Sequence, residues 1–208
     1  YKFPANFAQP YRARSLQEFW RRWHITLSTW LKDYLYIPLG GSRWGALATC
    51  RNLIVTMVLG GVWHGAGAQF VVWGAMHGVA LAFERLVGRD KASAPQGWMG
   101  ALLGWAATFA FVNLAWIFFR ATSIDLAFDF IWGIGFSEVA GTRLTPFIAG
   151  LIGLGMALHF LPPALRDKTA ERLEALPALG QAAVFALAVW CIAVTAPPGI
   201  PPFIYFQF

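Results

Sequence analysis

The chain has 208 residues, of which 58% are hydrophobic and 12% are charged, and its formal net charge is +6. A typical soluble domain is about 25% charged, so this composition argues against an ordinary water-soluble fold and favours a lipid bilayer as the solvent. Without a soluble domain to carry the positive charge, nucleic acid is not an expected partner.

The basic residues are concentrated at the start of the chain. Residues 1–51 hold eight basic and two acidic residues and so carry the whole net charge, which places them on the cytoplasmic side against anionic lipid. Ser15 and Glu18 match the S-x-x-E capping box that starts a helix. Apolar residues then recur at three- and four-residue spacing over 16–35, which predicts an amphipathic interfacial helix that ends before Pro38.

The next stretch, residues 52–83, has no charged residue and contains "LGGVWHGAGAQFVVWGAMHG" at 59–78. As one helix, 53–83 would measure about 46 Å, against a hydrocarbon core of about 30 Å. Its glycines offer places to bend, and an interrupted backbone is tolerated at membrane depth only around protein or a water-filled cavity. We therefore expect residues 52–85 to form a broken or tilted membrane element around a cavity.

Two histidines lie inside this apolar stretch. With residue 53 at the interface, His64 would be about 16 Å deep, and a polar ring there indicates either a functional site or a packed, hydrogen-bonded histidine. Desolvation favours the neutral imidazole, which can act as a general base. His77 would face nearly the opposite side of a continuous helix, so only a break could bring it to the same site; otherwise it would be a packing or gating residue.

Several chemistries do not fit the remaining pattern. The histidines His24, His64, His77 and His159 are too scattered for a zinc motif, so no metal is expected. Neither a nucleophile elbow nor a phosphate-binding glycine loop is present in the sequence. Base-assisted transfer to a hydroxyl remains, as does a transporter or channel that uses the histidines as a proton or solute pathway. A third alternative is a non-catalytic membrane anchor for a secreted transferase.

The rest of the chain is predicted to be scaffold. Apolar windows predict further spans at 98–119, 144–161 and 176–196, with the charged residues 166–174 at a membrane surface. The predicted fold class is therefore all-α: a polytopic membrane protein with an interfacial amphipathic helix and broken or tilted helices around a central cavity.

Three motifs carry a resemblance to a known family. The runs "FWRRWHITLSTWLKDYLYIPLGG" and "RNLIVTMVLGGVWHGAGAQFVVWGAMHG", with the ending "PPFIYFQF", resemble the membrane-bound O-acyltransferases, in their bacterial alginate O-acetylation branch. The motif match covers residues 1–85. Since members of that family are about twice this length, the resemblance implies that 1–208 is the C-terminal portion of a single membrane domain whose N-terminal half is absent here.

The resemblance also implies roles for individual residues. His64 would be the catalytic base, and His24 would be a second polar residue facing the same cavity. The expected mechanism, rather than the resemblance, adds further cavity residues. Asn52 could orient the base or stabilise an oxyanion, and His77 could take part if the helix breaks. Trp63, Phe70 and Trp73 would either wall the cavity and limit water or be plain packing residues.

The same resemblance implies the substrates and the location. No cofactor would be bound; an acyl thioester such as acetyl-CoA would be the co-substrate, and the protein would lie in the bacterial inner membrane as a multi-pass protein. The acyl group would reach an exported polysaccharide directly or through an extracytoplasmic acetylating partner protein.

Overall fold

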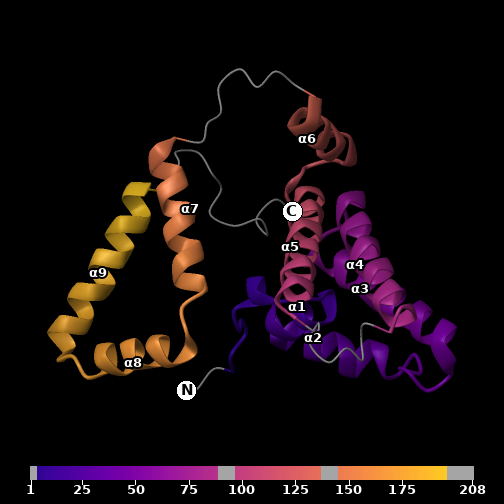
Figure 1. Ribbon diagram of the computed structural model, residues 1–208, viewed down its shortest axis with the longest axis horizontal. Helices are drawn as coiled ribbons and strands as arrows, with labels where there is room; N and C mark the ends of the chain where they lie inside the picture. The colour runs from indigo at the N-terminus through magenta and orange to yellow at the C-terminus, as the bar shows by residue number, and fades with distance from the viewer. Residues whose placement is uncertain (1–3, 89–96, 137–144, 196–208) are drawn as a thin grey trace. The chain divides into compact units, whose positions relative to one another are not determined.

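The computed structural model describes residues 4–88, 97–136 and 145–195, and the regular elements in these ranges are all helical. The chain is an all-α polytopic membrane protein, as the composition predicted. The C-terminal PPFIYFQF motif lies outside the described residues. Two units are distinguished, Tyr1–Ile148 and Ala149–Phe208. The helices labelled in Figure 1 are α1 (Leu16–Arg22), α2 (Ile25–Leu31), α3 (Gly45–His64), α4 (Ala68–Leu86), α5 (Trp98–Arg120), α6 (Ile124–Phe136), α7 (Pro146–His159), α8 (Pro163–Glu174) and α9 (Ala178–Thr195). A short π-helix, η2 (Lys32–Tyr36), follows α2.

The predicted amphipathic helix over 16–35 is divided into three shorter helices. Ser15 caps α1 by accepting a hydrogen bond from the backbone N–H of Glu18 at 3.1 Å, as the sequence motif indicated. Helix α1 nevertheless ends at Arg22, because Trp23 is extended and His24 adopts the left-handed conformation with φ 43°. Neither backbone conformation can continue a right-handed helix, so the segment turns at His24 before α2 and the π-helix η2 begin.

The predicted membrane element over 52–85 is a helical hairpin. Helix α3 begins at Gly45, seven residues before the uncharged window, and ends at His64; after a three-residue break, α4 runs back beside it (Figure 1). The glycines mainly allow this close packing. A Cβ at Gly78 would lie 2.7 Å from the Cα of Ile54, and a Cβ at Gly74 would collide with the backbone oxygen of Met57.

The hairpin is the support for the first unit. Helix α5 packs against α4, and α1 packs against the C-terminal half of α4. Glu84 fixes that second contact, because its buried carboxylate accepts hydrogen bonds from the backbone N–H groups of Leu16 at 2.8 Å and Gln17 at 3.1 Å. These two groups have no partner within the first turn of a helix, so Glu84 caps α1 from another helix.

Three helices of the described residues are long and apolar enough to cross a membrane: α3, α5 and α9. Helix α5 corresponds to the span predicted at 98–119, and α9 to the one predicted at 176–196. The window at 144–161 gives a helix of only 14 residues, which is followed after a 98° bend by α8. Pro162 and Pro163 lie at this bend, where the missing N–H of proline prevents the helix from continuing. If the bent pair is one span, it is the fourth.

Candidate active site

His64 lies at the end of α3, inside a cage of aromatic rings. Its side chain is 7% exposed, and its ring makes edge-on contacts with Trp63, Trp73 and Phe119 at centroid distances of 5.0, 5.3 and 4.9 Å. The nearest preceding arginine on the same helix is Arg51, which lies 13 residues, or about 20 Å, before His64. A polar ring is thus held among apolar neighbours far along a candidate membrane span.

His24 approaches the same region from the break between α1 and α2. Its left-handed backbone is uncommon for a residue other than glycine, and such strain persists only where the surroundings enforce it. The Nδ1 atom is buried and has no hydrogen-bond partner among the described residues. Burial lowers the pKa of this imidazole below its usual 6.5. Trp23, the neighbour of His24 in the chain, contacts Trp116 at 4.8 Å between ring centroids. Trp116 contacts Phe119 at 6.0 Å, and Phe119 contacts His64 at 4.9 Å, so a short series of aromatic contacts links the segment of His24 to His64.

His77 is the most deeply placed histidine among the described residues. It is 1% exposed, and its Nδ1 accepts a hydrogen bond from the indole Nε1–H of Trp20 at 3.2 Å. Because an indole N–H can only donate, Nδ1 carries the lone pair and the ring proton of the neutral form is on Nε2. Trp73 lies between the two hairpin histidines, 5.3 Å from His64 and 4.9 Å from His77. The helix break after His64 makes this shared contact possible.

The other predicted cavity residues separate into two groups. Phe70 and Trp73 are buried beside His64, and both contact Phe119, whereas Trp63 is 55% exposed on its outer side. Asn52 lies elsewhere: it is 12 residues, about 18 Å, before His64 on α3, and its Nδ2 donates to the carbonyl of Gly41 at 3.0 Å. The structure therefore gives Asn52 a role in holding the preceding loop on α3.

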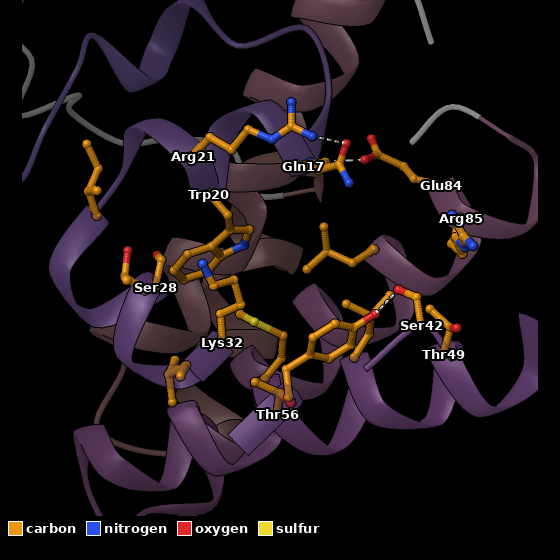
Figure 2. Close-up of a pocket in the computed structure, with 17 residues that line it drawn as sticks. Gln17, Trp20, Arg21, Ser28, Lys32, Ser42, Thr49, Thr56, Glu84 and Arg85 are labelled. Carbon is orange, nitrogen blue, oxygen red and sulfur yellow. Dashed lines mark hydrogen bonds between the residues drawn. The ribbon is translucent and has the colours of Figure 1, made fainter. Parts of the chain in front are cut away.

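A pocket of about 490 Å³ lies between the basic segment, residues 1–51, and the α3–α4 hairpin (Figure 2). Its lining combines three basic side chains with hydroxyl groups and an apolar part, and it includes none of His24, His64 and His77. The lining includes Trp20, Arg21, Leu31, Lys32, Met57, Leu81 and Arg85.

Sequence reasoning did not find this pocket or the contacts that shape it. Trp20 looked like one more tryptophan of an amphipathic stripe, and Glu84 looked like the residue that ends an uncharged window. The buried position of Glu84 had one signal in the sequence, namely a carboxylate directly after a long apolar stretch. Its partners, the N–H groups of Leu16 and Gln17, are 67 or more residues away, and no local pattern indicates that pairing.

The fold and the site together define a helical membrane protein with buried histidines at a helix break. Residues 3–124 match the sequence model described as MBOAT, the membrane-bound O-acyltransferase family. The chain belongs to the membrane-bound O-acyltransferase family. The match covers the basic segment, the hairpin and α5, and therefore all three histidines of the site.

Curated relatives have related names. The chain is 39% identical to the probable alginate O-acetylase AlgI of Pseudomonas putida over 233 residues, which cover 100% of the chain and 47% of the relative. It is 49% identical to the peptidoglycan O-acetyltransferase of Helicobacter pylori over 69% of the chain and 27% of the relative. It is 29% identical to the teichoic acid D-alanyltransferase of Streptococcus thermophilus over 61% of the chain and 35% of the relative. The chain thus spans about half the length of the P. putida relative.

Proposed function

We propose that this chain is part of a membrane O-acyltransferase that moves an acyl group, acetyl in the first instance, from a thioester donor to a hydroxyl of an exported polysaccharide. The acyl group reaches the polymer directly or through an extracytoplasmic partner protein. The observation that carries the proposal is the placement of His24 and His64 at helix breaks that a series of aromatic contacts links, within a family whose relatives are named for acyl transfer to cell-surface polymers.

His64 is proposed as the general base. The oxygen of the acceptor hydroxyl forms a bond to the acyl carbon as its proton passes to the imidazole. The carbon–sulfur bond then breaks, and the proton passes from the imidazole to the sulfur, which leaves as a thiol. The aromatic contacts of His64 with Trp73 and Phe119 limit access of water, which would otherwise hydrolyse the thioester.

His24 is proposed to bind the reacting oxygen. Its Nδ1 has no hydrogen-bond partner among the described residues, so a substrate can satisfy this buried atom. A neutral imidazole presents either a lone pair or an N–H at Nδ1: it can accept from the acceptor hydroxyl or donate to the oxygen that gains negative charge. The lowered pKa of His24 keeps the ring neutral at pH 7 and avoids a second charge near His64.

The pocket is proposed as the route of the donor. Arg21, Lys32 and Arg85 outnumber the one acidic side chain, Glu84, on its lining, and cations beside an apolar surface suit a donor with phosphate groups on one end and an acyl thioester on the other. Coenzyme A thioesters have this form. The positive charge of residues 1–51 supports entry from the cytoplasmic side.

The decisive experiment replaces His64 in the full-length protein. His64→Ala should lower the O-acetyl content of the exported polysaccharide by about 10²- to 10⁴-fold, the usual contribution of a general base, with unchanged amounts of protein in the membrane. His159→Ala, in α7, is the matched control and should keep wild-type acetylation. Unchanged acetylation in His64→Ala would indicate a non-catalytic anchor. Solute or proton flux in vesicles that depends on His64 would indicate a transporter instead.

A further inference from the structure

The pocket points toward the buried histidines but stops short of them. Along α3 its lining extends as far as Met57, and seven more residues, about 10 Å of helix, lead to His64. Along the antiparallel helix α4 the lining extends back to Leu81, and His77 lies one turn further in the same direction. A ligand that fills the pocket therefore approaches both histidines along the hairpin.

Trp20 stands at this inner end of the pocket. Its side chain is part of the lining and appears among the labelled side chains of Figure 2. On its other side, the indole contacts His77 at 5.2 Å and Trp73 at 5.8 Å between ring centroids, and Trp73 in turn contacts His64 at 5.3 Å. The rings of Trp20 and Trp73 therefore form a chain of contacts from the pocket to His64.

His77 fixes the orientation of this indole. The Trp20 Nε1–H has one hydrogen to donate, and it donates it to the Nδ1 of His77 at 3.2 Å. Since His77 is 1% exposed, rotation of the indole would leave a buried nitrogen without its partner. Edge-on packing against Trp73 opposes the same rotation. The aromatic ring at the inner end of the pocket is thus held by a second helix.

Leu31 of α2 also limits the space at the inner end of the pocket. It lines the pocket, is 5% exposed, and its Cδ1 lies 3.1 Å from the position that a Cβ on Gly60 would occupy. The inner end of the pocket is therefore narrowed by Trp20 from α1 and by Leu31 from α2, both lying against the hairpin.

We propose that Trp20 is a specificity-determining residue that limits the size of the acyl group reaching His64, and that His77 is a positioning residue that holds Trp20 in place. The inference rests on the proposed function, because it requires the pocket to receive an acyl thioester. A two-carbon acyl group needs little space beside the indole. Each further methylene group requires the indole to move, against its hydrogen bond to His77 and its packing.

The test compares donors that differ only in acyl length. Permeabilised cells that contain the full-length protein receive equal amounts of acetyl-CoA and butyryl-CoA, and the acyl esters on the exported polysaccharide are measured by mass spectrometry. The wild type should favour acetyl by on the order of tenfold or more, since butyryl is longer by two methylene groups and each one in a tight apolar pocket gives discrimination of at least about that size. Trp20→Leu should reduce this ratio by about tenfold.

Variants of His77 separate positioning from bulk packing. His77→Leu removes the acceptor for the indole N–H and should lower the acetyl preference, though less than Trp20→Leu. His77→Asn can present a side-chain oxygen near the position of Nδ1 and should restore the wild-type ratio. Trp30→Phe is the matched control and should leave the ratio unchanged, because Trp30 is 47% exposed, stacks on Tyr34 and does not line the pocket.

The outcomes distinguish this inference from the proposed function. A wild-type acetyl preference in Trp20→Leu overturns the role of Trp20 and leaves the acyltransferase proposal intact. If Trp20→Leu does not accumulate in the membrane, Trp20→Phe replaces it; that ring keeps most of the packing, loses the N–H, and should show the same change as His77→Leu. Unchanged ratios in both of these variants overturn the inference. A wild type that transfers neither acyl group overturns the thioester proposal and this inference with it.

Discussion

The same residue type has opposite surroundings in the two units of the chain. In the α3–α4 hairpin, a Cβ at Gly61, Gly74 or Gly78 would collide with the backbone of the facing helix. In α7, a Cβ at Gly150 or Gly153 would meet no described atom within 4 Å. Both regions are apolar and rich in glycine, so the difference shows that a glycine pattern alone does not indicate which helices pack closely.

Burial follows the same division. Of the described residues, the buried ones all belong to the first unit, and residues of α8 and α9 are largely exposed. The histidine site therefore lies in the part of the chain that encloses its own core. Paired substitutions, one in each region, test whether this difference describes the full-length protein.

The largest effect is expected from enlarging a hairpin glycine. Gly78→Ala places a Cβ 2.7 Å from the Cα of Ile54, and neither helix backbone can move away without separating the hairpin. We expect a loss of about 3 kcal/mol of stability, measured as a lower midpoint of thermal aggregation of the solubilised full-length protein. Gly153→Ala in α7 is the control and should be neutral or slightly stabilising, because alanine favours helices. Equal destabilisation by both would show that α7 also packs closely against another element.

The next effect concerns the buried carboxylate of Glu84. Glu84→Ala leaves the backbone N–H groups of Leu16 and Gln17 without acceptors, so it should cost about 2 kcal/mol and loosen α1 from α4. Glu84→Gln keeps one acceptor oxygen and should cost less. Glu174, exposed at the end of α8, provides the matched change Glu174→Ala, which should have little effect. Protease cleavage within α1 is the measurement; equal protection of the Glu84→Ala and wild-type proteins would contradict the capping role.

The sequence predicted the elements of this fold better than their contacts. The apolar windows located α5 and α9, and the S-x-x-E motif located the start of α1, because span length and helix capping depend on neighbouring residues. A broken or tilted element over 52–85 was expected from helix length, but the position of the break and its result, a close-packed hairpin, depend on contacts such as the one between Gly74 and Met57.

The site shows the same limit. The sequence predicts His64 as a polar residue in an apolar stretch and His24 from a family resemblance; the structure links them through ring contacts of Trp23, Trp116 and Phe119. Asn52 was predicted to orient the base or stabilise an oxyanion, yet it lies about 18 Å before His64 along α3 and donates a hydrogen bond to the carbonyl of Gly41. The hydrogen bond between Trp20 and His77 joins residues 57 positions apart, so no local pattern could indicate it.

A smaller effect is expected at the strained backbone of His24. Alanine at φ 43° would be strained, so His24→Ala should cost about 1 kcal/mol in addition to the loss of the imidazole. Asparagine tolerates the left-handed region, so His24→Asn should keep the backbone and remove only the titrating group. The two variants should therefore differ in thermal stability, and equal midpoints of thermal aggregation would contradict the proposed strain.

The pH dependence of acylation gives a second test of the same residue. Burial lowers the pKa of His24 below 6.5, so the neutral form persists at pH 7 and is lost only as the pH falls through that lowered value. Transfer that requires neutral His24 should therefore decline as the pH falls below 6.5 through that lowered value. The His24→Asn profile should lack the part of this decline that His24 causes. An identical decline of acyl transfer at low pH in both proteins would show that protonation of His24 does not cause it.

The smallest effect is expected for the ion pair of α8. Arg166 and Asp167 are 3.2 Å apart with side chains 55% and 61% exposed, so water screens the pair and Arg166→Ala should change the stability by less than about 0.5 kcal/mol. Arg22 provides the comparison in the first unit: it pairs with Glu18 at 2.8 Å and also donates to the carbonyl of Ala8 at 3.1 Å, so Arg22→Ala should cost about 1 kcal/mol. A large loss of stability in Arg166→Ala would mean that another part of the full-length protein covers α8. An ion pair that water screens contributes too little energy to explain such a loss.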